Sequence, residues 1–81
     1  MMKQSSWAEF AHKVDEARRQ QHLSIRQFGL AAGVPKATAQ GWLNGRHMPT
    51  PALRQKFLAA IAELGLSQDV PGGLWEDPVD A

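Results

Sequence analysis

The chain has 81 residues, which is enough for one small domain. It contains no cysteine, so disulfide bridges and thiolate metal sites are excluded and apolar packing must hold the core. No apolar run reaches the roughly 18 residues that a membrane span needs, and the segment from Met1 to Trp7 lacks the pattern of a secretory signal. We therefore expect a cytoplasmic protein with no membrane partner.

The net charge of +1 hides an uneven distribution. Residues 1–66 carry all nine Lys and Arg but only four of the eight acidic residues, which gives +5. Residues 67–81 carry the other four acidic residues and no Lys or Arg, which gives −4. This division predicts a basic domain over 1–66, suited to a polyanionic partner, and an acidic C-terminal tail over 67–81. Two prolines and the pair Gly72-Gly73 indicate irregular structure in the tail.

Strand signals are absent, because the chain lacks Tyr and no stretch alternates apolar and polar residues. The first predicted helix runs from about Trp7 to Gln21. Ser6 and Glu9 have capping-box spacing at its start. Its apolar residues recur at helical spacing and form one inward face: Trp7, Phe10, Ala11, Val14 and Ala17.

A second helix is predicted over Ile25 to Ala32. Ser24 and Gln27 repeat the capping-box spacing, and Gly33 is suited to end the helix in the left-handed conformation. Its inward residues are Ile25, Phe28, Gly29 and Ala32.

A third helix is predicted from Pro35 to Asn44, because proline is tolerated in a first turn. Ala39 and Trp42 share its inward face with Thr38. The opposite, outer face is formed by Lys36, Ala37, Gln40, Gly41 and Asn44.

After a loop over residues 46–49, Thr50 is predicted to cap a fourth helix, with Pro51 at its first position and its end near Leu64. The expected buried stripe of this helix is Leu53, Phe57, Ala60, Ile61 and Leu64. Four leucines have no evident core role in this scheme and are candidates for an interface with a second copy: Leu30, Leu43, Leu58 and Leu74.

The second and third predicted helices form one unit around a tight turn at Gly33-Val34. Gly29 allows another helix to pass closely, Gly33 permits a positive φ, and Val34 fills the gap. An angled helix pair of this kind presents the outer face of its second helix to the major groove of DNA.

The stretch LSIRQFGLAAGVPKATAQGWLNGRHMP, residues 23–49, resembles the Cro/phage-repressor (XRE-type) helix-turn-helix family. The resemblance extends over about residues 8–66 and implies an all-α, lambda-repressor-like helix-turn-helix domain of four to five helices. Its elements are Leu23-Ser24, Phe28-Gly29, Gly33-Val34, Ala39 with Trp42, Asn44-Gly45-Arg46 with Pro49, and Leu64-Gly65-Leu66.

This resemblance implies a sequence-specific transcriptional regulator that binds double-stranded DNA. It assigns base reading to Lys36, Ala37, Gln40 and Gly41, and phosphate contacts to Ser24, Arg26, Gln27, Thr38, Asn44 and Arg46. Lysine donates to guanine O6 and N7, and glutamine pairs with adenine N6 and N7. Only two long polar side chains stand on the reading face, so DNA shape is expected to share the readout.

Plainer interpretations of the same residues stay open at this point. Lys36, Gln40, Asn44 and Arg46 would also fit an ordinary solvated surface, and Trp42 would fit a base-stacking position. The three histidines do not share a helix face at metal-ligand spacing, and no nucleophile–base pair or phosphate-binding loop is present. We therefore expect no metal, no cofactor and no enzymatic activity.

The simplest mechanism is repression by occlusion of an operator. A single short recognition helix favours a homodimer on a pseudo-palindromic site. One alternative is a protein-interaction module such as an antitoxin, which would bind its partner through the tail with Leu74 and Trp75. Another is an architectural or recombination factor that bends DNA. A stable co-purifying partner would favour the first alternative, and a DNA-bending assay would identify the second.

Overall fold

The computed structural model describes residues 6–75 of the chain. Within this range it is all-α, as the sequence predicts, with four α-helices, two short 3-10 helices and no strand. The elements in order are α1 (Ser6–Gln20), α2 (Ile25–Ala32), α3 (Lys36–Leu43), η1 (Pro51–Leu53), α4 (Arg54–Glu63) and η2 (Ser67–Asp69).

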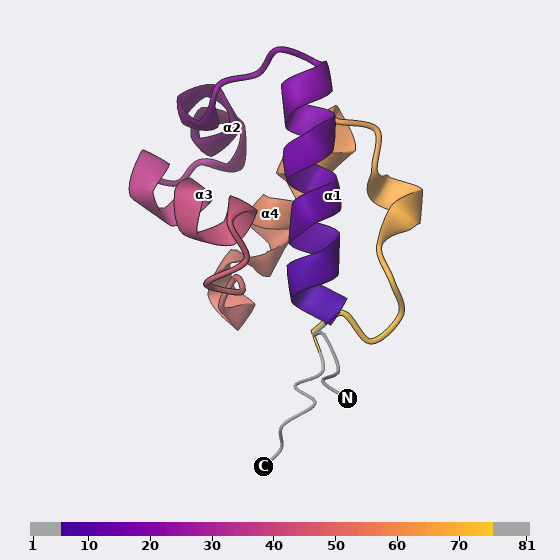
Figure 1. Ribbon diagram of the computed structural model, residues 1–81. Coiled ribbons are helices and arrows are strands. Elements are labelled where there is room, and N and C mark those ends of the chain that lie inside the picture. The colour runs from indigo at the N-terminus through magenta and orange to yellow at the C-terminus, as the bar shows by residue number, and fades with distance from the viewer. Residues whose placement is uncertain (1–5, 76–81) are drawn as a thin grey trace.

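Helix α1 runs along the length of the molecule, with α2 and α3 on one side and α4 behind (Figure 1). The segment that follows α4 passes down the other side of α1 and returns to its first turn (Figure 1). The α2–α3 pair is therefore displayed on its own side of the molecule, away from the returning segment.

The predicted inward faces form the core. Phe10, Val14, Phe28, Phe57 and Ile61 are all essentially inaccessible to solvent. The remaining predicted core residues are buried or partly buried against this cluster: Trp7, Ala11, Ala17, Ile25, Gly29, Ala32, Ala39, Trp42, Leu53, Ala60 and Leu64.

The prediction that four leucines lack a core role is wrong for Leu43 and Leu74, which are only 6% and 2% exposed. Leu43 is buried at the end of α3, a helix that packs against α1, and Leu74 is buried because the chain returns after η2. Leu58 packs partly against the core. Only Leu30, 73% exposed, is free to meet a second copy among these four.

The predicted start of α2 is confirmed in atomic detail. Ser24 Oγ accepts a hydrogen bond from the Gln27 backbone N–H at 3.0 Å, and Gln27 Oε1 accepts one from the Ser24 N–H at 2.8 Å. Gly33 ends α2 in the left-handed conformation with φ of 75°. Both devices satisfy backbone groups that a helix terminus would otherwise leave unpaired. The capping box predicted for Ser6 involves a side chain outside the described part of the structure.

Two helix starts differ slightly from the prediction. Pro35 precedes α3 in an extended conformation with ψ of 156°, so the helix begins one residue later, at Lys36. Thr50 precedes a 3-10 turn, Pro51–Leu53, and α4 begins only at Arg54. A tighter first turn is a common way for a helix to begin.

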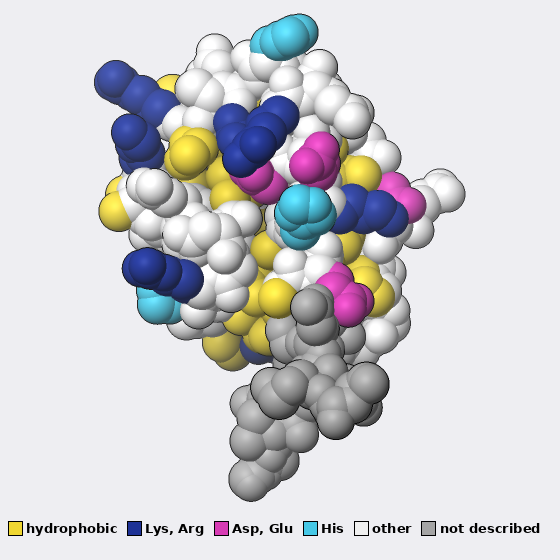
Figure 2. Space-filling view, viewed as in Figure 1, with side chains coloured by type: hydrophobic (Ala, Val, Ile, Leu, Met, Phe, Trp, Pro, Cys, Tyr) yellow, Lys and Arg dark blue, Asp and Glu magenta, His cyan; other side chains and the backbone are white. Residues whose placement is uncertain are grey.

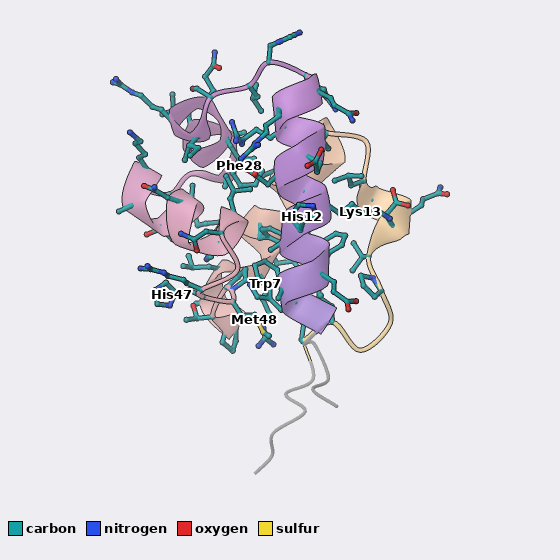
Figure 3. All side chains as sticks on the ribbon, viewed as in Figure 1. Trp7, His12, Lys13, Phe28, His47 and Met48 are labelled. Atoms are coloured by element: carbon teal, nitrogen blue, oxygen red, sulfur yellow. The ribbon has the colours of Figure 1, made fainter. Side chains whose placement is uncertain are left out.

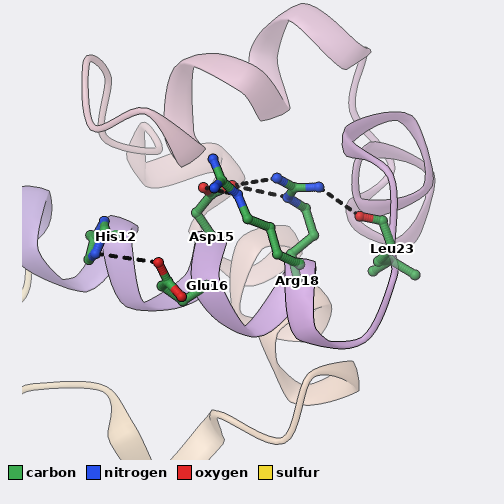
Figure 4. A network of polar contacts seen from close by, with 6 residues as sticks. His12, Asp15, Glu16, Arg18 and Leu23 are labelled. Carbon is green, nitrogen blue, oxygen red and sulfur yellow. Dashed lines mark hydrogen bonds and ion pairs between the residues drawn. The ribbon is translucent and has the colours of Figure 1, made fainter.

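The turn between α1 and α2 is held by Arg18, whose side chain is 12% exposed. Its Nε and one terminal nitrogen donate to Asp15 Oδ1 at 3.0 and 2.8 Å, and the other terminal nitrogen donates to the Leu23 carbonyl at 2.8 Å (Figure 4). The planar guanidinium thus joins the last turns of α1 to the residue before the α2 cap.

The first part of the predicted tail packs against the helices. Trp75 stacks on Trp7, and Arg54 lies over its ring at 4.9 Å from the centroid. Asp69 of η2 pairs with Lys13 of α1 at 3.8 Å. Residues 76–81, with the other three acidic residues of the tail, lie outside the described part of the chain.

Candidate nucleic-acid interface

The α2–α3 pair is set at a close angle by Gly29 and the turn that follows it. A Cβ at Gly29 would lie 3.0 Å from the Val34 carbonyl oxygen and 3.5 Å from the Ala39 Cβ. The Val34 N–H also donates to the Gly29 carbonyl at 2.9 Å. The close helix approach predicted at Gly29 is confirmed, and it turns the outer face of α3 toward solvent.

The predicted base-reading residues differ in how far they are exposed to solvent. Lys36, Ala37 and Gln40 are exposed on the outer face of α3. Gly41 is buried, because the ring of His47 lies over it. The expectation that Gly41 stands open on the reading face is therefore wrong, although its neighbours on that face are open.

The residues at the start of α2 that are predicted to contact phosphates have hydrogen-bond donors available for a ligand. Ser24, Arg26 and Gln27 are exposed at the start of the helix. Gln27 Oε1 is occupied by the capping box, so its amide NH2 group is the part that points outward as a donor. Arg26 has no acidic residue beside it on α2, which contains none.

The predicted phosphate-binding residues at the end of α3 lie in a turn that is closed by a side-chain hydrogen bond. Asn44 Oδ1 accepts a hydrogen bond from the Arg46 backbone N–H at 3.0 Å, and both side chains are exposed. Thr38 is half-buried and lines a neighbouring hollow with Ala37 and His47. The structure therefore groups Asn44 and Arg46 with Gln40 in one hollow and places Thr38 in the adjoining one.

Helices α2 and α3 contain no acidic residue, and Asp15 of α1, which lines a hollow with Gln40 and Asn44, is paired with Arg18 and Arg19. Between Glu16 and Glu63 the chain has no Asp or Glu. The same stretch contains seven basic residues: Arg18, Arg19, Arg26, Lys36, Arg46, Arg54 and Lys56. Figure 2 shows Lys and Arg side chains at the α2–α3 edge, whereas Asp and Glu side chains gather over α1 and the returning segment. The uneven charge favours approach of a polyanion from the α2–α3 side.

Trp42 is a core residue. Its ring is 2% exposed and meets Phe57 edge-on, with centroids 5.5 Å apart. The alternative of a base-stacking role requires an open ring face, which this burial removes.

No group of His, Asp or Glu within residues 6–75 is arranged to hold a metal ion. Over the same residues, no helix combines the length and apolar character that a membrane crossing requires.

The family model described as Helix-turn-helix matches residues 14–64, more than half of the chain. The chain belongs to the XRE-type helix-turn-helix family. No protein with a curated description and no solved structure matches it. The matched range covers α2 and α3 with their caps and ends at Leu64, just after α4. Members of this family are DNA-binding regulatory domains, so this helix-turn-helix protein is a DNA-binding transcription regulator.

His47 is the residue of this face that sequence reasoning missed. It lies three residues beyond Asn44, outside the predicted third helix, where helical spacing assigns no residue to the reading face. A signal was nonetheless present, since a glycine in the middle of a short helix costs about 1 kcal/mol relative to alanine and calls for a packing reason.

Proposed function

We propose that this helix-turn-helix protein is a sequence-specific repressor that occupies a pseudo-palindromic operator as a homodimer. The observation that carries the proposal is the outer face of α3, a helix without acidic residues, on which Lys36 and Gln40 are exposed and Gln40 shares a hollow with Arg46. In the major groove, lysine and glutamine side chains distinguish base pairs by hydrogen bonds to base edges.

The contacts divide into two kinds. Lys36 and Gln40 read bases, with Ala37 close enough to the groove floor for apolar contact with a thymine methyl group. Ser24, Arg26 and Gln27 on α2, and Asn44 and Arg46 after α3, bind the phosphates on either side. Thr38, half-buried in the adjoining hollow, is a further candidate for a phosphate contact.

A dimer is proposed because a single short recognition helix offers few base contacts. Two copies on a symmetric site double those contacts at half-sites about one helical turn apart. Leu30, 73% exposed on α2, is the large apolar side chain that remains open for such an interface within residues 6–75.

Selection of bound duplexes from a random pool tests the proposal. The expected product is one short motif with two-fold symmetry, and its affinity should fall steeply as salt rises from about 50 to 200 mM, because bound phosphates release counterions. Selection that enriches no motif, together with weak binding at the lowest salt, would refute the proposal. Sedimentation with and without the selected duplex reports the number of copies bound.

The antitoxin-like alternative rested on Leu74 and Trp75 as a free apolar anchor. Both residues are engaged by the protein's own core, Leu74 by burial and Trp75 by stacking on Trp7. No observation in residues 6–75 favours that function over DNA binding.

A further inference from the structure

His47 occupies the place that a side chain at position 41 would fill on the outer face of α3. A Cβ built on Gly41 would lie 2.7 Å from His47 Cδ2, closer than unbonded carbons approach, and 3.5 Å from its Cγ, an ordinary contact. The imidazole ring therefore lies directly over the backbone of α3. Only a glycine at position 41 leaves room for it there.

The backbone holds His47 in this position from both sides. The His47 N–H donates to the Gly41 carbonyl at 3.1 Å, which ties the loop back onto α3. The preceding turn is closed by the bond from the Arg46 N–H to Asn44 Oδ1. The placement of the ring thus follows from a short, hydrogen-bonded loop.

The side chain of His47 is exposed and faces the reading surface. It lines one hollow with Ala37, Gln40 and Asn44, where the helix residues are small or polar. Figure 3 places it at the α3 side of the molecule, whereas His12 projects from α1. Neither ring nitrogen has a hydrogen-bond partner within the described residues, so both are available to a ligand.

We propose that His47 is a specificity-determining residue, which donates a hydrogen bond to an acceptor on a base edge, of the kind guanine presents at N7 and O6. The inference rests on the proposed DNA-binding function and adds to it. Ala37 and Gly41 are too small to reach a base by hydrogen bonding, and the loop supplies the missing polar group above them. The reading surface then has three polar side chains: Lys36, Gln40 and His47.

The test uses the full chain, with affinities for the selected duplex and for single-base-pair variants of it. His47→Ala should bind the selected duplex about 10-fold more weakly and lose preference at one base pair. That base pair should differ from those affected by Lys36→Ala and Gln40→Ala.

The matched control His12→Ala, whose side chain projects from α1 away from α3, should bind every duplex as the wild type does. An equal loss for every duplex, which indicates a phosphate contact, or no loss at all would overturn the proposal for His47. If Lys36→Ala and Gln40→Ala alter selectivity in the same assay, the DNA-binding function stands and only this inference fails. A wild type that binds no duplex selectively would overturn both.

Discussion

The indole of Trp75 stacks on the indole of Trp7, with ring centroids 6.2 Å apart and planes inclined by 28°. Trp75 also meets Phe57 edge-on at 6.1 Å, and Phe57 is edge-on to Trp7 at 5.2 Å. One end of α1, the first turns of α4 and the last described residue are thereby joined in one aromatic cluster. A domain this small buries only about 60% of its unfolded surface, so such a cluster contributes a large share of its stability.

Trp75→Ala should therefore destabilise the protein although the residue lies beyond the matched family range. We expect a loss of about 2 kcal/mol, less than the 3–5 kcal/mol typical of a fully buried aromatic residue, because Trp75 is only half-buried. Urea unfolding followed by circular dichroism measures the loss. The control Gln55→Ala, at an exposed site of α4 with no assigned role, should change stability by less than about 0.5 kcal/mol. Equal stability of Trp75→Ala and the wild type would show that the stacking is not maintained in solution.

Arg18 and Arg19 offer a matched comparison, because both side chains contact Asp15. Arg18 is 12% exposed and makes three hydrogen bonds, whereas Arg19 is 66% exposed and makes one contact, to Asp15 Oδ2 at 3.1 Å. Lysine cannot reproduce the forked geometry of a guanidinium. Arg18→Lys should therefore cost about 1–2 kcal/mol, and Arg19→Lys less than about 0.5 kcal/mol. Thermal melts of the two variants in parallel would contradict this view if the two losses were equal.

The helices and most of the core follow from the sequence because amphipathic spacing records which face of each helix is buried. Phe10 with Val14, and Phe57 with Ile61, lie four residues apart and are inaccessible to solvent. Leu43 escaped the prediction because its burial depends on how α3 crosses α1, which no local pattern encodes. Leu74 escaped it because the acidic, proline and glycine residues around it are typical of a free tail.

Helical spacing also predicts most of the candidate site, but not the part that depends on contacts between segments. Helical spacing places Lys36, Ala37 and Gln40 on one outer face, and the structure leaves all three exposed. The same spacing assigns Gly41 to that face, but it cannot show that a residue from the following loop covers it. The position of His47 depends on the turn that Asn44 closes. The sequence therefore predicts the helix residues of the reading face but not His47, which comes from the following loop.

Base readers and phosphate binders on this face should respond differently to truncation. Lys36→Ala or Gln40→Ala should cost about 1–3 kcal/mol of binding free energy and relax preference at one base pair. Arg46→Ala should weaken binding to all duplexes alike and reduce the slope of log affinity against log salt by about 1. Titrations over a panel of single-base-pair variants at several salt concentrations separate the two effects. Identical profiles and slopes for Lys36→Ala and Arg46→Ala would mean that the reading face is assigned wrongly.

Because the His47 ring packs on Gly41, substitutions at the two positions should have non-additive effects on the free energy of unfolding, measured in the absence of DNA. Alanine in a helix is more favourable than glycine by about 1 kcal/mol, so Gly41→Ala should stabilise α3 by that amount if nothing opposed it. In the wild-type background the new Cβ must displace the His47 ring, which lies 2.7 Å away, and part of the gain is lost. In the His47→Ala background the space is empty and the full gain should appear.

A double-mutant cycle of Gly41→Ala and His47→Ala measures this difference directly, from four unfolding curves recorded without DNA. We expect Gly41→Ala to stabilise the His47→Ala protein by about 1 kcal/mol and the wild type by clearly less. In the unfolded chain the added methyl group has the same surroundings in both backgrounds. A difference between the two stabilisation free energies therefore reports a contact in the folded state. Equal gains in both backgrounds would place the His47 ring away from α3, and the loop-borne reading group would then lose its structural basis.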